Sequence, residues 1–295
     1  MLAEYKHSKL PIIAILLGAA IWGIIWFPFR VLDHAGIGGE YATTITYFFA
    51  LVLGLVIFRS SLAIHKIFNG DAKLLLWIAL FSGIANIAYI LGVINGEIMR
   101  VLLLFYLAPL WTIFFARFLL NERLSIHGYF VITLSLSGAA FILWQPGQTF
   151  PLPQSYSDWM GLLGGFMFAL VNVLVRKDQS HNIALKSIAI WFGITLVGLA
   201  CSLNLNESFN FADISLGIWS LLLVVGLLMF VASMALQYGL TYTPANQAVV
   251  IMLFELVVAA ITAYFLANEA MTSREWIGGL MIISAALFSS KVNRV

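Results

Sequence analysis

Charged residues are scarce in this 295-residue chain, where Asp, Glu, Lys and Arg together make up 9%, against roughly 25% in an ordinary soluble domain. Soluble folds need polar residues to cover their surface, and disordered or nucleic-acid-binding chains need abundant charge. These three classes are therefore excluded. A single cysteine, Cys201, excludes an internal disulfide and a cysteine-built metal site. In contrast, 62% of the residues are hydrophobic and the mean hydropathy is +1.00, which predicts an integral membrane protein.

Common catalytic motifs are missing as well. The chain contains no Gly-x-x-x-x-Gly-Lys phosphate loop, no His-Glu-x-x-His zinc motif and no Gly-x-Ser-x-Gly nucleophile motif. Its acidic residues are scattered, so a membrane protease built on two facing aspartates has no residues to work with. We therefore expect no metal, no cofactor and no enzymatic activity.

Ten apolar stretches are long enough to cross a membrane, which takes about 20 helical residues. They cover residues 10–30, 41–58, 74–95, 99–120, 128–145, 158–175, 187–203, 215–238, 245–267 and 274–290. They are too long and too uniformly apolar for β-barrel strands, and the connectors are too short for a second domain. We expect an all-α integral membrane protein with ten transmembrane helices in a single transmembrane domain, residues 1–295. The first stretch lacks a convincing cleavage site, so we expect it to be a retained helix.

The positive charges predict the orientation, because Lys and Arg collect on the cytoplasmic side of membrane proteins. If the N-terminus is inside, twelve of the fifteen fall inside, and only Arg30, Arg100 and Arg274 fall outside. All seven lysines then lie at the ends of spans or in cytoplasmic segments, and no lysine or histidine lies in mid-span. We expect a multi-pass protein of a bacterial inner (cytoplasmic) membrane, with both termini cytoplasmic.

The two halves of the chain match weakly at an offset of 146 or 147 residues. Gly18 falls on Gly164, Arg30 on Arg176 and Asn86 on Ser233. Each half holds five spans, an odd number, so the second half must enter the bilayer from the opposite side. We therefore predict an inverted repeat, with repeat one over about 10–145 and repeat two over about 158–290. This architecture is typical of secondary transporters, which bind substrate near the midplane between the halves.

Two motifs resemble a known family. The fourth span contains Pro109 and ends in Leu-Leu-Asn-Glu, residues 119–122, and the first span carries Ala-Ile-Trp-Gly, residues 20–23. Both resemble EamA-type proteins of the drug/metabolite transporter superfamily, whose fourth helix reads "Pro … Leu-Leu-Gly-Glu". Asn121 and Asn268 replace the usual glycine, and Leu256 stands where the family usually has proline. The resemblance covers essentially the whole chain and implies a ten-helix exporter of small metabolites, often amino acids. The aromatic amino-acid exporters are the most similar branch.

Glu255 is the one acidic residue near the middle of a predicted span. Charges inside the bilayer are costly and usually functional, and burial disfavours the ionised form of a carboxyl group. Glu255 either couples transport to protons, or binds a substrate ammonium group, or pins its helix to a neighbour through a hydrogen bond.

Other polar and aromatic residues fall at related depths in spans 1, 3, 4, 6 and 8. Asn86 and Tyr89 share one helix face, as do Ser233 and Gln237. Each alone could be a contact between membrane helices, but the set favours a cavity. The predicted substrate-binding residues are Trp22, Trp26, Asn86, Tyr89, Tyr106, Trp111, Asn172, Ser233, Gln237 and Glu255.

Three further features complete the prediction. Arg100 is placed in the outer vestibule, where it either attracts a carboxylate or contacts lipid headgroups. Pro109 removes a backbone donor and is predicted to bend the fourth span beside the site, as a hinge. The other tryptophans fall near span ends and are predicted to lie in the interfacial belt: Trp77, Trp144, Trp159, Trp191, Trp219 and Trp276.

The expected function is a secondary transporter that exports small metabolites by alternating access, with amino acids as the first expectation. A broad multidrug or cation exporter is the alternative, in which Glu255 would pair with a cationic substrate. A membrane enzyme or assembly factor acting on lipids is a further alternative, for which we find no interfacial polar cluster. The expected partners are a small-molecule substrate, the lipid bilayer and, as a candidate coupling ion, protons. No nucleic acid is expected, and the protein is expected to be a monomer or weak dimer.

Overall fold

The computed structural model describes residues 9–63, 67–68, 71–95, 98–143, 153–203, 214–267, 272–289 and 292–293. Within these ranges the chain is all-helical, and its only β pairing is an isolated antiparallel bridge between Leu124 and Asn293. The helices are α1 (Leu10–His34), α2 (Gly39–Ile57), the 3-10 turn η2 (Arg59–Ser61), α4 (Ala72–Asn95), α5 (Ile98–Phe105), α6 (Ala108–Leu119), α7 (Ile126–Leu143), α8 (Tyr156–Lys177), α9 (Ile183–Ser202), α10 (Leu216–Tyr242), α11 (Ala245–Met252), α12 (Phe254–Ala267) and α13 (Ser273–Leu287).

Each predicted span coincides with one helix or with two consecutive helices. In the described part of the chain, eight segments are long and apolar enough to cross a membrane. The fifth and tenth predicted spans correspond to shorter apolar helices, 126–142 and 276–287. The chain is thus an all-helical integral membrane protein with eight candidate spans, and the count of ten stays a prediction.

Two of the spanning segments are interrupted. The first break separates α5 from α6, and Pro109 lies in the first turn of α6, where its missing N–H cannot bond the carbonyl of Phe105. That carbonyl packs directly against Gly165 of α8, where a Cβ atom would collide with it. The second break, at Leu253 between α11 and α12, has no proline and was not predicted. Both breaks lie inside the bundle, where irregular backbone is tolerated.

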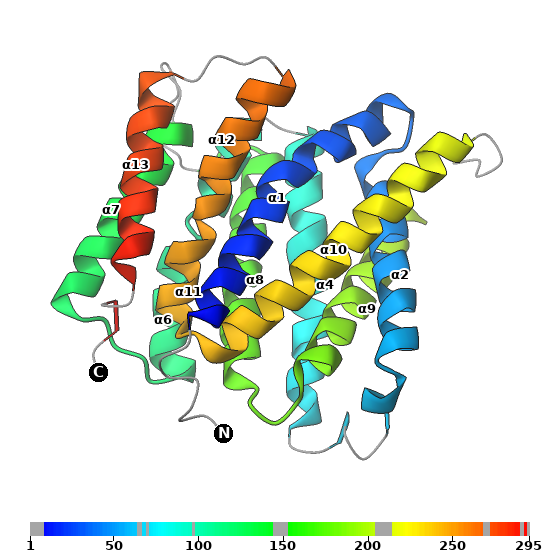
Figure 1. Cartoon of the computed structure of the whole chain (residues 1–295), viewed down its shortest axis with the longest axis horizontal. Helices are drawn as coiled ribbons and strands as arrows, with labels where there is room; N and C mark the ends of the chain where they lie inside the picture. Colours follow the sequence, from blue (N-terminus) through cyan, green and yellow to red (C-terminus); the bar gives the residue numbers. More distant parts are fainter. Residues whose placement is uncertain are drawn as a thin grey trace.

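The helices pack in pairs across the two halves of the chain (Figure 1). α1 packs on α10 and α4 packs on α8, while α2 contacts α9 and α7 contacts α13. α7 and α13 form one end of the bundle, and α2 lies toward the other end. α1 begins and α13 ends at the lower side in this view.

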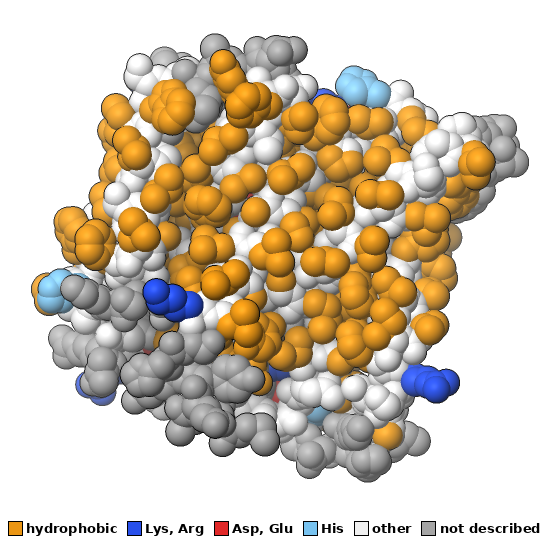
Figure 2. Space-filling model, in the orientation of Figure 1, with side chains coloured by type: hydrophobic (Ala, Val, Ile, Leu, Met, Phe, Trp, Pro, Cys, Tyr) orange, Lys and Arg blue, Asp and Glu red, His pale blue; other side chains and the backbone are white. Residues whose placement is uncertain are grey.

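The outside of the bundle is apolar. Figure 2 shows hydrophobic side chains over the face formed by α13, α12, α1 and α10, with Lys and Arg side chains visible mainly at its lower edge. Large apolar side chains on several helices are more than half exposed, including Phe118, Phe265 and Leu216. A soluble protein rarely exposes apolar patches of this extent, so this surface faces lipid.

Trp191 is the one predicted interfacial tryptophan that the structure clearly contradicts. Its side chain is fully buried, stacks on Phe230 with 4.9 Å between ring centroids, and packs on Gly54 of α2. The prediction was wrong because the span was expected to begin at residue 187. α9 begins at Ile183 instead, which places the indole farther from the helix end.

Candidate functional site

A cavity of about 120 Å³ lies at the centre of the bundle. Residues from nine helices line it, from α1, α2, α4, α5 and α8 to α12. The lining residues that bear on its chemistry are Trp22, Tyr47, Ser82, Asn86, Tyr89, Phe105, Phe168, Asn172, Ser233, Gln237, Met252 and Glu255. The cavity is therefore mostly aromatic and apolar, with a few polar groups, as small-molecule sites usually are.

Glu255 lies in the first turn of α12, just after the break at Leu253. A helix N-terminus presents unpaired N–H groups and favours a negative charge. The Tyr106 side chain interacts electrostatically with the Glu255 carboxyl group. α1 approaches the same turn closely, because a Cβ at Gly23 would lie 2.7 Å from the backbone oxygen of Glu255. The break and this close packing hold the carboxyl group at the cavity wall.

Seven of the ten predicted substrate-binding residues line the cavity, namely Trp22, Asn86, Tyr89, Asn172, Ser233, Gln237 and Glu255. Trp26, Tyr106 and Trp111 do not. The Trp26 Nε1–H donates to Thr262 Oγ1 at 3.0 Å, and the Arg30 guanidinium lies 4.8 Å from the Trp26 ring centroid. Trp111 packs edge-on against Phe166, and its Nε1–H has no hydrogen-bond partner.

Some of the other predicted residues lie outside the described part of the structure, and Pro109 lies inside it. Arg100 belongs to the first turn of α5, but its side chain lies outside the described part of the structure. Asn268 and Trp144 also lie outside the described residues. Pro109 is buried beside the α5–α6 break, so the helix is interrupted where a hinge was predicted.

Sequence reasoning missed the contribution of α2 and α9. Tyr47 of α2 lines the cavity together with Asn86 of α4. Ile190 and Ile194 of α9 form part of the apolar wall. Ser82 lies four residues before Asn86 on α4, and this spacing was a signal that could have added it to the predicted face.

Several polar atoms in the lining have no partner. Ser82 Oγ, Asn86 Oδ1 and Gln237 Oε1 are buried and accept no hydrogen bond from any residue that the structure describes. The Asn172 amide is engaged, because Nδ2 donates to the Met252 sulfur at 3.8 Å. Leaving a buried polar atom unpaired costs about 1–3 kcal/mol, so the three open acceptors mark places where a ligand could bind. Among the described residues, no group of three or more His, Cys, Asp or Glu side chains could hold a metal ion.

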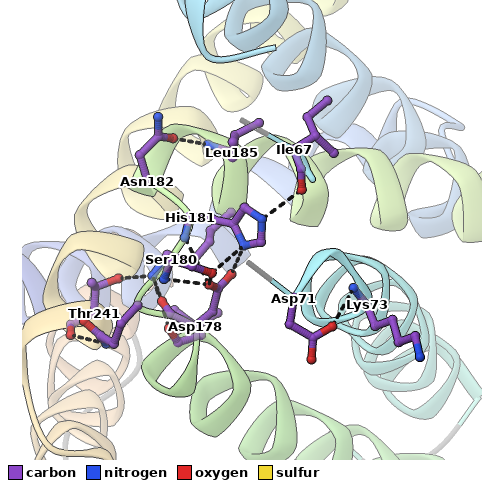
Figure 3. A network of polar contacts seen from close by, with 12 residues as sticks. Ile67, Asp71, Lys73, Asp178, Ser180, His181, Asn182, Leu185 and Thr241 are labelled. Carbon is purple, nitrogen blue, oxygen red and sulfur yellow. Dashed lines mark hydrogen bonds and ion pairs between the residues drawn. The ribbon is translucent and has the colours of Figure 1, made fainter. Parts of the chain in front are cut away.

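A separate polar network lies at the end of the bundle where α8 meets α9 (Figure 3). The His181 ring bridges two connectors, with Nδ1 2.8 Å from the Asp178 carboxylate and Nε2 3.0 Å from the Ile67 carbonyl. The Lys186 side chain is fully buried in α9 and donates from Nζ to the carbonyls of Val175 and Asp178 and to Thr241 Oγ1. Lys186 lies in the first turn of α9, at a span end as predicted, but its complete burial was not predicted.

Glu122 connects this end of the bundle to α11. Its carboxylate accepts hydrogen bonds from the backbone N–H groups of Ala245 and Asn246, at 3.1 and 3.4 Å, and from Asn293 Nδ2 at 3.0 Å. Asn121, just before it, has φ 57°, a left-handed conformation that glycine and asparagine tolerate at helix ends. Asparagine can therefore stand where related helices have glycine, and the turn directs Glu122 at the start of α11.

Comparisons with known proteins agree with this arrangement. The model of the EamA-like transporter family matches twice, over residues 9–144 and 155–291. A curated relative from Archaeoglobus fulgidus, an uncharacterized transporter, is 25% identical over 219 residues, which cover 74% of this chain and 76% of the relative. A solved crystal structure superposes with a TM-score of 0.80 at 13% identity, covering 96% of this chain and 97% of its own, a likeness of fold alone. The resemblance seen in the first and fourth spans is confirmed: the chain is a membrane transporter that belongs to the EamA-like transporter family.

Proposed function

We propose that this transporter exports small metabolites that carry an amino group, across a bacterial inner membrane, by alternating access to the central cavity. Amino acids and organic cations both carry such a group. The observation that carries the proposal is the cavity itself, a pocket with one carboxyl group at the centre of an otherwise apolar bundle. A single chain encloses this cavity, so a monomer is sufficient for the proposed transport.

The packing of the helices supports two inverted repeats, about 10–145 and 158–290. Under the predicted offset, α1 corresponds to α8 and α4 to α10, and the contact of α1 with α10 has its counterpart in the contact of α8 with α4. α2 corresponds to α9 and α7 to α13, and each of these helices contacts its own counterpart. The two separate family matches also fit two repeats. α1 begins and α13 ends on one side of the bundle (Figure 1), as an even number of crossings requires.

The polar network around Asp178, Lys186 and Glu122 supports a closed gate at the predicted cytoplasmic end. Its bonds join the connectors that follow α2, α6 and α8 to the last turn of α10, the first turn of α11 and Asn293. We propose that these bonds keep the cavity closed on this side and must break before substrate enters from the cytoplasm. In the same proposal, Arg100 lies in the outer vestibule, and Pro109 acts as a hinge.

Glu255 has the central role in the proposed cycle. Its carboxyl group binds the substrate amino group and releases it when a proton takes its place, so that protons couple to export. Among the described residues, the hydroxyl groups of Tyr106 and Tyr89 are titratable groups that interact with it electrostatically. Trp22, Asn86, Asn172, Ser233 and Gln237 surround the substrate, whereas Trp26 and Trp111 support the wall from outside the cavity.

The test is counterflow in proteoliposomes, with a panel of labelled amino acids and amines. We expect exchange of at least one compound, and we expect Glu255→Gln to abolish it or remove its dependence on pH. Ser284→Ala is the matched control, because this residue is on α13 and its hydroxyl bonds only the Leu280 carbonyl. Equal exchange and an equal pH profile in Glu255→Gln would remove Glu255 from the mechanism.

A further inference from the structure

We infer that the cavity selects small organic amines that lack a carboxylate over zwitterionic amino acids. The inference rests on the proposed transport function and narrows its substrate class. Three properties of the lining support it: its charge, its open hydrogen-bonding atoms, and its size together with its aromatic walls.

The charged side chains of the lining have one sign. Glu255 is there, but no Lys, Arg or His is among the lining residues that the structure describes. Two cations on helices that line the cavity are engaged elsewhere: the buried Lys186 of α9 donates to two carbonyls and a hydroxyl, and the half-buried Arg176 of α8 donates to the Thr241 carbonyl. An ammonium group therefore finds a counter-charge in the cavity. A carboxylate finds none and is repelled by Glu255, which is costly where the dielectric constant is low.

Three fully buried atoms of the lining are acceptors or can act as acceptors and have no partner among the described residues. Asn86 Oδ1, Gln237 Oε1 and Ser82 Oγ are buried without a partner. One amide donor of the lining is used within the protein, because Asn172 Nδ2 donates to the Met252 sulfur. A protonated amine brings only donors and satisfies these acceptors. A carboxylate brings only acceptors and would leave the two amide oxygens, Asn86 Oδ1 and Gln237 Oε1, unpaired.

Aromatic rings surround the polar groups. Trp22, Tyr47, Tyr89, Phe105 and Phe168 all line the cavity, and aromatic faces attract ammonium ions when water is excluded. An apolar cavity of about 150 Å³ holds a benzene molecule, so a cavity of about 120 Å³ suits an amine with a single ring or a short chain. Larger multi-ring cations would need the cavity to expand.

Four probes that share one phenylethyl body separate these properties: phenethylamine is a cation, phenylalanine a zwitterion, 3-phenylpropionate an anion and 2-phenylethanol neutral. We would measure their binding to the full-length protein in detergent by isothermal titration calorimetry. We expect phenethylamine to bind at least about tenfold more tightly than phenylalanine or 2-phenylethanol, because a charge-assisted hydrogen bond contributes that much. The anion should bind most weakly. Phenylalanine binding as tightly as phenethylamine, or no binding of phenethylamine, overturns the inference.

Two variants test whether the preference for phenethylamine depends on Glu255 in the cavity. Glu255→Gln should weaken phenethylamine binding at least about tenfold and change 2-phenylethanol binding by less than about twofold. Ser284→Ala should bind all four probes like the wild type. If Glu255→Gln binds phenethylamine normally, the carboxyl group is not the counter-charge and the inference is wrong. Counterflow of phenylalanine by a protein that does not bind phenethylamine would overturn the amine preference and leave the transport proposal standing.

Discussion

Replacing Glu122 with glutamine should open the predicted cytoplasmic gate. Pro244, the N-cap residue of α11, makes no side-chain capping bond, so the Glu122 carboxylate caps this helix from another part of the chain. The amide of glutamine has nearly the same shape, but it carries no charge and has one oxygen instead of two. The single side-chain oxygen of glutamine can accept hydrogen bonds from the α11 N–H groups or from Asn293 Nδ2, but not from both.

The magnitude follows from the bonds that are lost. A helix cap contributes about 1 kcal/mol, and a hydrogen bond to a charged group contributes about 1.5–3 kcal/mol. Glu122 is only half-buried, so we take the low end and expect the closed state to lose about 2–3 kcal/mol. This corresponds to an increase of roughly 30- to 150-fold in the ratio of open to closed molecules.

A cysteine at Ser233 in the cavity reports this opening. The native Cys201 is first replaced by serine, and a membrane-impermeant thiol reagent is added to the cytoplasmic face of inverted membrane vesicles. We expect Glu122→Gln to increase the alkylation rate of Ser233→Cys at least about tenfold, since the rate follows the open population.

Asp158→Asn is the matched control. Asp158 also lies at a helix N-terminus, where its carboxylate accepts from the backbone N–H groups of Gln154 and Ser155, but at the opposite end of α8 from the network. It should leave the cytoplasmic alkylation rate unchanged. An unchanged rate in a folded Glu122→Gln protein, or an equal increase in Asp158→Asn, would refute the proposed gate.

Two stability predictions follow from the packing. Gly193→Ala should reduce the free energy of unfolding by about 1–3 kcal/mol, because its Cβ would collide with the Ala79 carbonyl and force α9 away from α4. Thermal unfolding in detergent should show this loss. Gly217→Ala should show no such loss, because the nearest contact of its Cβ is Ser215 Oγ at 3.8 Å. Lys186→Met should destabilise by about 3 kcal/mol because it leaves two carbonyls at the end of α8 without a donor. The exposed Lys177→Met at the same helix end should change stability by less than about 0.5 kcal/mol, and equal effects of the two lysine changes would contradict the role of Lys186.

Much of the fold could be predicted because hydropathy alone specifies where membrane helices lie. A chain with 9% charged residues leaves few alternatives, and each predicted span overlaps a helix or a pair of helices. Glu255 could be singled out because a carboxyl group in the middle of a span is unusual. Asn86 and Gln237 followed from their helical spacing to another polar residue.

The features that were missed depend on contacts between distant parts of the chain. The break at Leu253 has no proline to announce it, and only the packing of α12 against α1 and the cavity accounts for the place of Glu255 beside it. Lys186 looks like a residue at the end of a span, and its burial follows from acceptors at the ends of α8 and α10. The orientation of Trp26 and Trp111 away from the cavity likewise depends on helix rotation, which span length and hydropathy do not specify.

The most direct test of the account is an experimental structure of the full-length protein with phenethylamine bound. The account predicts the ammonium nitrogen within hydrogen-bonding distance of the Glu255 carboxyl group, with the ring among Trp22, Phe105 and Phe168. Ligand density on the lipid-facing surface, or a ligand in the cavity whose amine points away from Glu255, would contradict it.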